Sequence, residues 1–127
     1  MDLLLDTHVF LWWDADSPDL GAECRTAIAD PANRVFVSAA SIWEIGIKRR
    51  TGKLAFSGSA VEAVQANGFV ELPIFGRDAE AAAALDWGHA DPFDRLLVAQ
   101  AQAGSLILAT ADKAIRRYGA VAQLAAG

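Results

Sequence analysis

Four carboxylates in this sequence follow apolar runs or stand in the helices next to them, where a site is to be expected. Asp6 directly follows Leu3–Leu5, an apolar run with the length and flanks of a buried strand. Ligands of open α/β sheets bind beyond the carboxyl ends of the strands, so an acid at this point is a candidate for binding or catalysis. The alternative role for Asp6 is to cap a helix that begins near Thr7.

The other three acids occupy comparable places. Glu44 lies in the helix after the second apolar run, Asp94 in the first turn of a later helix, and Asp112 just after the run at 105–109. In a parallel sheet with right-handed crossovers, the loops at the strand ends gather on one edge. Clustered carboxylates repel one another unless a cation neutralises them, and oxygen ligands suit Mg²⁺ or Mn²⁺. The sequence therefore predicts a metal site made by Asp6, Glu44, Asp94 and Asp112.

Two of these acids also have purely structural interpretations. Ser41 and Glu44 have the spacing of a capping box, and Glu44 with Lys48 forms a favourable i,i+4 ion pair. Asp112 could cap the short helix that contains Ile115.

Asp94 is harder to explain by a structural role. On a helical wheel it falls between Val98 and Ala101, which predicts a partly buried acid. Asp91, directly before Pro92, is first of all a helix cap, although it could also reach a metal ion through a water molecule.

The elements that must position these acids alternate between strand and helix. Strands are predicted at 3–5, 34–38, 70–73 and 105–109, with a weaker edge strand at 121–124. Helices are predicted at 7–14, 19–30, 39–50, 59–67, 78–85, 92–104 and 113–118, with Gly104 closing the sixth. This alternation predicts one domain, residues 1–127, with a parallel sheet covered on both faces.

Composition narrows the function further. The chain has 54% hydrophobic residues and a net charge of -5, so no overall basic field attracts nucleic acid, and any RNA contact must be local or bridged by metal. Cys24 is the single cysteine, which fits a reducing cytoplasm. Because Asp6 interrupts the first apolar run, neither a signal peptide nor a membrane span is expected.

Neighbouring polar residues have weaker interpretations. Thr7 and Thr110 each adjoin an acid, so their hydroxyls could hold a ligand carboxylate or a substrate phosphate, or serve as local caps. His8 and His89 have no evident partner in the sequence, so packing or hydrogen bonding is the favoured role for both.

Basic residues gather at 48–53 and again at Lys113, Arg116 and Arg117. Both groups could simply complement helix C-termini. If they flank the acids, they would instead clamp RNA phosphates on both sides of the scissile bond. The candidate phosphate contacts are Lys48, Arg49, Arg95 and Lys113.

Four ordered motifs together resemble those of PIN-domain ribonucleases, specifically the VapC-type toxins of bacterial toxin–antitoxin pairs. They are LLLDTH at 3–8, SIWEIGIK at 41–48, HADPFDRLLVAQA at 89–101 and TAD at 110–112. The resemblance implies a three-layer α/β/α sandwich with a central parallel sheet. It also implies that Asp6 and Asp94 are the direct ligands of Mg²⁺ or Mn²⁺, completed by Glu44 and Asp112. A VapB-type antitoxin and a homodimer are further implications, whereas residues 121–124 are less apolar than a usual final strand.

The expected function is therefore a Mg²⁺-dependent endoribonuclease that hydrolyses phosphodiester bonds in accessible single-stranded or loop regions of RNA. One alternative is a Mg²⁺-dependent phosphatase or phosphotransferase, but the sequence lacks the second Asp two residues after Asp6 that haloacid-dehalogenase-like enzymes carry. The other alternative is a non-catalytic PIN-like binding module, against which the complete set of four acids argues.

Overall fold

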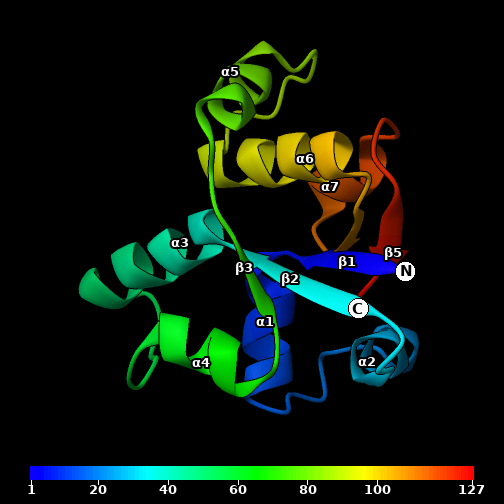
Figure 1. Ribbon diagram of the computed structural model, residues 1–127. Helices are drawn as coiled ribbons and strands as arrows, with labels where there is room; N and C mark the ends of the chain where they lie inside the picture. The colour runs from blue at the N-terminus through cyan, green and yellow to red at the C-terminus, as the bar shows by residue number, and fades with distance from the viewer.

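A five-stranded parallel sheet organises the chain in the computed structural model, which describes residues 1–127 (Figure 1). The strand order is β3-β2-β1-β4-β5, so the first strand of the sequence lies at the centre of the sheet. The strands are β1 (Asp2–Leu5), β2 (Arg34–Ser38), β3 (Val70–Leu72), β4 (Ile107–Thr110) and β5 (Gln123–Ala125).

Seven helices connect and cover the strands. They are α1 (Thr7–Asp14), α2 (Ala22–Ala29), α3 (Ala39–Arg50), α4 (Ala60–Ala66), α5 (Gly76–Ala84), α6 (Pro92–Gly104) and α7 (Lys113–Arg117). None of them combines the length and the hydropathy needed to cross a membrane.

Strand β1 divides the apolar interior into two cores. Leu3, Leu4 and Leu5 are all fully buried, and because successive side chains of a strand point to opposite faces, they supply both cores. Leu3 and Leu5 pack in the core beneath α1, α2 and α4, whereas Leu4 packs in the core beneath α6 and α7. Figure 1 shows these helices on opposite sides of the sheet. The predicted three-layer α/β/α sandwich is confirmed.

Several predicted boundaries are wrong by a few residues, for local reasons. The helix predicted at 19–30 begins only at Ala22, because Ser17 first forms a turn that accepts the backbone N–H of Leu20. The helix predicted at 78–85 starts earlier, at Gly76, because the Asp78 carboxylate accepts the N–H of Phe75 and closes the first turn.

The junction between α6 and β4 also differs from the prediction. Gly104 is the last helical residue and not the stop, since Ser105 takes the left-handed conformation, with φ of 52°, that ends α6. Strand β4 consequently begins at Ile107. The weak final strand does form, shifted to Gln123–Ala125, and it pairs in parallel with β4.

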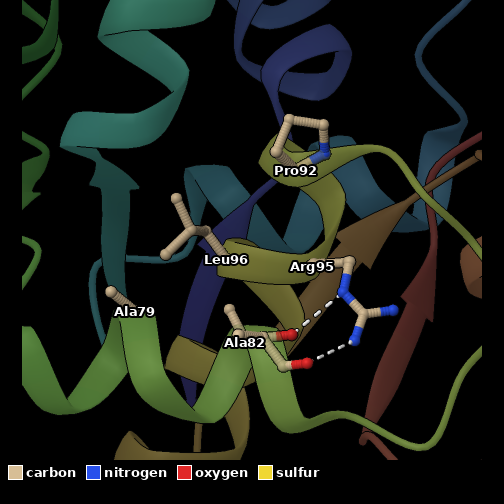
Figure 2. Close-up of a pocket in the computed structure, with 6 residues that line it drawn as sticks. Ala79, Ala82, Pro92, Arg95 and Leu96 are labelled. Carbon is tan, nitrogen blue, oxygen red and sulfur yellow. Dashed lines mark hydrogen bonds between the residues drawn. The ribbon is translucent and has the colours of Figure 1, made fainter.

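Helix α5 packs on α6 and leaves a small hollow between them (Figure 2). Its volume is about 250 Å³, and none of the four predicted site acids lines it. The lining residues are Ala79, Ala82, Ala83, Pro92, Arg95 and Leu96.

Leu4→Ala should lower the free energy of unfolding by about 2–5 kcal/mol, because Leu4 is fully buried in the central strand and its truncation leaves a cavity. The matched control is Val70→Ala on edge strand β3, where the side chain is 46% exposed and the cost should stay below about 1 kcal/mol. Urea unfolding measures both variants. Equal losses would contradict the central position of β1.

Candidate metal centre

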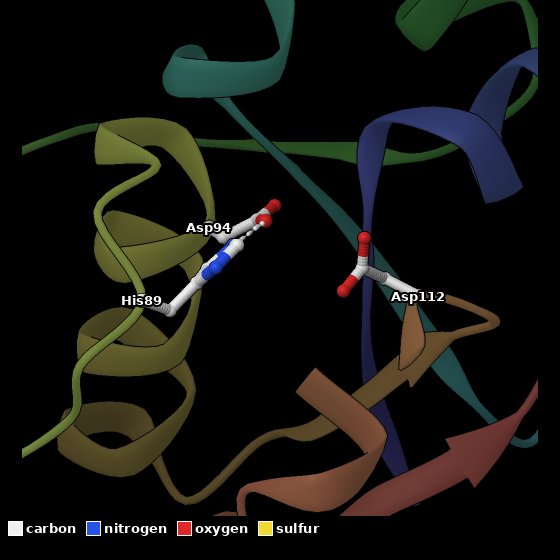
Figure 3. Close-up of side chains that lie close together, drawn as sticks. All are labelled: His89, Asp94 and Asp112. Atoms are coloured by element: carbon white, nitrogen blue, oxygen red, sulfur yellow. Dashed lines mark hydrogen bonds and ion pairs between the residues drawn. The ribbon is translucent and has the colours of Figure 1, made fainter. Parts of the chain in front are cut away.

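Acidic side chains from separate parts of the chain meet at the carboxyl ends of β1 and β4. These strands are direct neighbours, and Leu5 pairs with Ala109, so Asp6 and Asp112 follow adjacent strand ends. Across from them lies Asp94 in the first turn of α6 (Figure 3). Asp94 and Asp112, together with His89, each offer a ligand atom within 4.8 Å of the other two. Asp6 and Glu44 lie outside this closest group.

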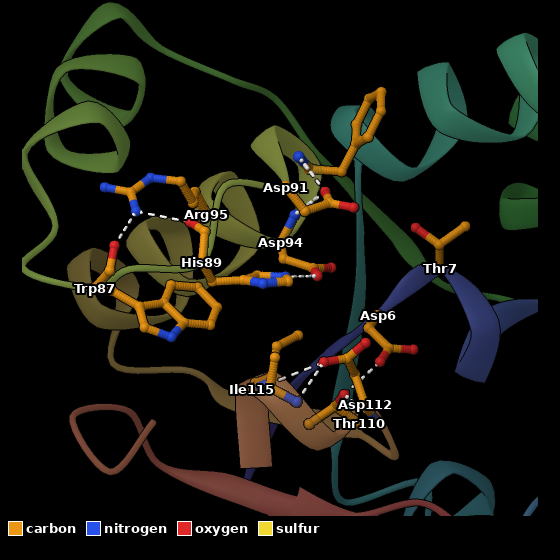
Figure 4. A network of polar contacts seen from close by, with 12 residues as sticks. Asp6, Thr7, Trp87, His89, Asp91, Asp94, Arg95, Thr110, Asp112 and Ile115 are labelled. Carbon is orange, nitrogen blue, oxygen red and sulfur yellow. Dashed lines mark hydrogen bonds and ion pairs between the residues drawn. The ribbon is translucent and has the colours of Figure 1, made fainter. Parts of the chain in front are cut away.

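Asp6 is held by hydrogen bonds to both carboxylate oxygens. Oδ1 accepts the backbone N–H of Val9 at 2.8 Å and so caps α1, as the alternative interpretation predicted. Oδ2 accepts the hydroxyl hydrogen of Thr110 (Figure 4). The side chain is nevertheless buried, and burial raises its pKa against the opposing effect of these hydrogen bonds. Capping does not exclude metal binding, since each oxygen keeps a second lone pair.

Thr110 links two of the acids. Its hydroxyl donates to Asp6, and the same oxygen accepts the backbone N–H of Asp112 at 3.0 Å. The side chain of Asp112 accepts the N–H groups of Ala114 and Ile115 on Oδ1, at 2.9 and 3.1 Å, and so caps α7. Oδ2 of Asp112 makes no hydrogen bond, and the side chain is exposed, so this oxygen is available to a ligand.

Glu44 is a buried acid fixed by two partners. The Thr7 hydroxyl donates to Glu44 Oε1 at 2.6 Å, and Lys48 Nζ lies 2.7 Å from Oε2. Thr7 thus holds one of the predicted ligand carboxylates, and the predicted i,i+4 ion pair is confirmed. Lys48 serves as the counterion of Glu44, which reduces what it can offer to a phosphate.

The predicted capping box of Glu44 is wrong. It required Ser41 to be the N-cap of α3, but the helix begins at Ala39, as predicted, and its N-cap is Ser38, whose hydroxyl accepts the N–H of Ala40. Ser41 is therefore an interior residue of α3, and its Oγ lies 2.9 Å from the Thr7 hydroxyl oxygen.

Asp94 is a partly buried acid in the first turn of α6. Burial raises the pKa of Asp94 to about 6, with further contributions from the neighbouring charges of Asp91 and Asp112 and an opposing hydrogen bond to His89. Asp91 accepts the N–H groups of Phe93 and Asp94 on Oδ1, so its predicted capping role is confirmed.

His89 belongs to this centre although the sequence indicated no partner for it. Its Nε2 lies 2.7 Å from Oδ2 of Asp94. The imidazole packs on Trp87, with ring centroids 4.8 Å apart, and Trp87 stacks on Tyr118 at 4.7 Å. His89 lies five positions before Asp94, which is not a spacing that brings side chains together on a helix. Only the path of the irregular segment 85–91 brings them together.

Arg95 has no guanidinium N–H group free for a phosphate, because all five already donate hydrogen bonds. They donate to backbone carbonyls at 2.6 to 3.3 Å, and Figure 2 shows two of these bonds. The acceptors are the carbonyls of Ala82, Ala83, Leu85, Trp87 and His89. Arg95 thus satisfies the end of α5 and fastens the segment that carries His89, and this contradicts the predicted phosphate contact.

The remaining predicted phosphate contacts differ in what they touch. Arg49 is exposed and donates from Nη1 to the carbonyls of Phe56 and Gly58. Lys113 is exposed at the start of α7, directly after Asp112. The contacts of Arg49 and Lys113 with RNA stay predictions.

The donor set of the centre suits a divalent cation. Carboxylate oxygens predominate, the nearest cation is Lys48, and the pKa values of Asp6 and Asp94 are both raised because burial disfavours their charged forms. A bound cation would offset this cost. Asp94 and Asp112 face each other with one or more oxygens free of backbone partners, so the residues present fit such an ion.

Comparison with known proteins adds independent information. A family model described as the PIN domain matches residues 3–121. A search of curated proteins finds no significant match.

Three solved structures of similar fold are distant from this chain in sequence. VapBC2 from Rickettsia felis, bound to a DNA fragment from its promoter, superposes with a TM-score of 0.68 at 14% identity and covers 100% of both chains. A toxin–antitoxin complex from Klebsiella pneumoniae gives 0.67 at 19% identity, over 97% of this chain and 96% of the other. FitAcB from Neisseria gonorrhoeae gives 0.60 at 22% identity, with coverage of 97% and 96%.

Asp94→Asn should stabilise the metal-free protein at neutral pH by about 1–3 kcal/mol. The folded-state pKa of Asp94, about 6, lies above the ordinary 3.8, so the folded state binds this proton more tightly. Wild-type stability from this group is therefore fully present below about pH 4 and is lost as the pH rises through about 6. Urea unfolding in EDTA between these limits measures the effect. Exposed Asp19→Asn is the control, and parallel pH profiles of wild type and Asp94→Asn would contradict the assignment.

Arg95→Lys should lower the free energy of unfolding by about 2–4 kcal/mol, because one ammonium group cannot reach five carbonyls that the guanidinium spans. Arg117→Lys, an exposed substitution on α7, should change stability by less than about 0.5 kcal/mol. Thermal unfolding compares the two. A loss no larger than that of the control would show that the five hydrogen bonds are dispensable.

Proposed function

This chain belongs to the PIN-domain family, and we propose that it is a Mg²⁺-dependent endoribonuclease, the toxin of a toxin–antitoxin pair, in which Mn²⁺ can replace Mg²⁺. One domain of residues 1–127 would carry the activity. The observation that carries the proposal is the meeting of Asp94 and Asp112 beside Asp6, at the carboxyl edge of a parallel sheet.

The metal ion would be held by Asp6 and Asp94, with Asp112 and Glu44 completing the acidic set. When bound, the ion would supply Lewis-acid activation of water and of the scissile phosphodiester. Oδ2 of Asp112 is free to accept a hydrogen bond from the attacking water and so to orient it. Thr110 and Thr7 keep the carboxylates of Asp6 and Glu44 in place through their hydroxyl groups.

RNA would be bound locally, because the net charge of -5 provides no general attraction for a polyanion. Lys113 directly follows Asp112, and Arg116 and Arg117 are also exposed on α7, so this helix offers cations without an ion-pair partner close to an acid of the centre. Arg49 in the last turn of α3 is a further candidate. Single-stranded or loop regions fit best, since their backbone can bend to reach a site at a sheet edge.

A protein partner is proposed from the similarity to solved toxin–antitoxin structures. Complexes of a toxin with its antitoxin are among the structures of similar fold, which supports a VapB-type antitoxin for this chain. A homodimer is proposed from the resemblance of the sequence motifs alone. Trp43, 60% exposed on α3, packs edge-to-face against Phe93 at 5.3 Å and offers apolar surface beside the acids. The absence of an internal disulfide is consistent with the cytoplasmic location that we propose.

The test is cleavage of a mixed pool of tRNA and rRNA fragments by purified protein free of antitoxin, in Mg²⁺, in Mn²⁺ and in EDTA. We expect cleavage that needs metal and falls by about 100-fold or more in Asp6→Asn and in Asp94→Asn, since each removes a metal ligand. Asp19→Asn carries the same charge change on an exposed residue and should cleave as the wild type does.

Undiminished cleavage by both site variants would overturn the assignment of the acids. Metal binding without any cleavage would instead favour a non-catalytic PIN-like module.

A further inference from the structure

We propose that His89 is a direct ligand of the metal ion, a nitrogen donor beside the acids; this inference rests on the metal site of the proposed function. The atoms that carry it are Nε2 of His89, Oδ2 of Asp94 at 2.7 Å, and a carboxylate oxygen of Asp112, all within 4.8 Å of one another. Two ligands of one such ion lie about 3 to 4.2 Å apart, given metal–ligand distances near 2.1 Å. Nε2 of His89 and Oδ2 of Asp94 are slightly closer than this, so they must separate by about 0.3 Å to share an ion. The three side chains otherwise span about one coordination sphere (Figure 3).

The imidazole is presented to the acids by its Nε2 atom alone. Nε2 has Asp94 as its partner, whereas Nδ1 makes no hydrogen bond within the protein. In the tautomer that carries its hydrogen on Nδ1, the lone pair of Nε2 points at the acids. A cation between Nε2 and Asp94 Oδ2 would take the place of the hydrogen that these two atoms share, and that proton would leave to solvent.

Both the backbone and the ring of His89 are held by contacts with other residues, although His89 lies in an irregular segment. Nη1 of Arg95 donates to the carbonyl of His89 at 3.0 Å and to that of Trp87 at 2.6 Å, which fixes the backbone on both sides. The imidazole itself lies against the Trp87 indole, which in turn stacks on Tyr118 with an interplanar angle of 21°. Such preorganisation from separate contacts is what a ligand position needs.

The second histidine of the chain provides the natural control. His8 is exposed on α1, and its only aromatic neighbour is Trp12, with ring centroids 6.3 Å apart. It makes no hydrogen bond to an acid of the centre and is not part of the close group of ligand atoms.

A nitrogen ligand has a measurable consequence for metal preference. Carboxylates alone suit the hard ion Mg²⁺, whereas imidazole shifts affinity toward transition metals. The wild-type protein should therefore bind Mn²⁺ more tightly than Mg²⁺, and His89→Ala should weaken Mn²⁺ binding by about 10-fold or more while changing Mg²⁺ binding less.

The deciding experiment is pulsed electron paramagnetic resonance of the full chain loaded with Mn²⁺, which detects ¹⁴N of a coordinated imidazole. We expect the nitrogen modulation in wild type and in His8→Ala, and its loss in His89→Ala and in His89→Gln. The Gln variant matters because its amide can still hydrogen-bond to Asp94 but provides no imidazole. If His89 only positioned Asp94, the wild type would show no modulation, and that result would overturn the proposal.

Persistence of the signal in both His89 variants would overturn it as well. The outcome is separable from the proposed function. Metal-dependent RNA cleavage by a protein without the nitrogen signal would overturn only the ligand assignment. A nitrogen signal in a protein that cleaves no RNA would overturn only the nuclease proposal.

Discussion

Burial of one carboxylate at the end of the central strand is the constraint on which this structure depends. Asp6 is only 5% exposed, and a charge in that position is tolerated only when hydrogen bonds satisfy it. Thr110 supplies one of them from the end of β4, and Val9 supplies the other from the first turn of α1. The hydrogen bond from Thr110 to Asp6 also joins the ends of β4 and β1, and Asp112 follows Thr110 by two residues. The same hydrogen bond therefore stabilises the buried carboxylate and brings Asp112 close to Asp6.

The N-termini of helices contribute to this centre as a group. Asp6 caps α1, Asp91 caps α6 and Asp112 caps α7, so three helices begin where the acids meet. The positive end of each helix dipole and its free N–H groups offset part of the repulsion among neighbouring carboxylates. An acid that caps a helix in this fold can therefore still bind a ligand at the site. The cap hydrogen bond fixes the carboxylate and so the direction in which its remaining lone pairs point.

Sequence reasoning located the strands and the four acids because each depends on local pattern. Unbroken apolar runs mark buried parallel strands, and an acid after such a run lies at the edge where ligands bind. It did not find the roles of His89 and Arg95, which depend on the path of the irregular segment 85–91. Tertiary hydrogen bonds decide that path, and no periodicity encodes it. The start of α3 at residue 39 was predicted correctly, but the capping-box interpretation of Ser41 and Glu44 was wrong, because Ser38 and not Ser41 is the N-cap.

The position of β1 has a consequence for how the chain is made. This strand leaves the ribosome before the other four, yet one of its two neighbours in the sheet is β4, and the bond from Thr110 to Asp6 spans 104 residues. Pairing over such a separation is slow and cannot begin until residue 110 has been synthesised. A nascent chain that ends just before this point has Asp6, Glu44 and Asp94, but it lacks Asp112 and the Thr110 hydroxyl that holds Asp6. The acidic centre would therefore be complete only after the segment that carries Thr110 and Asp112 has been synthesised.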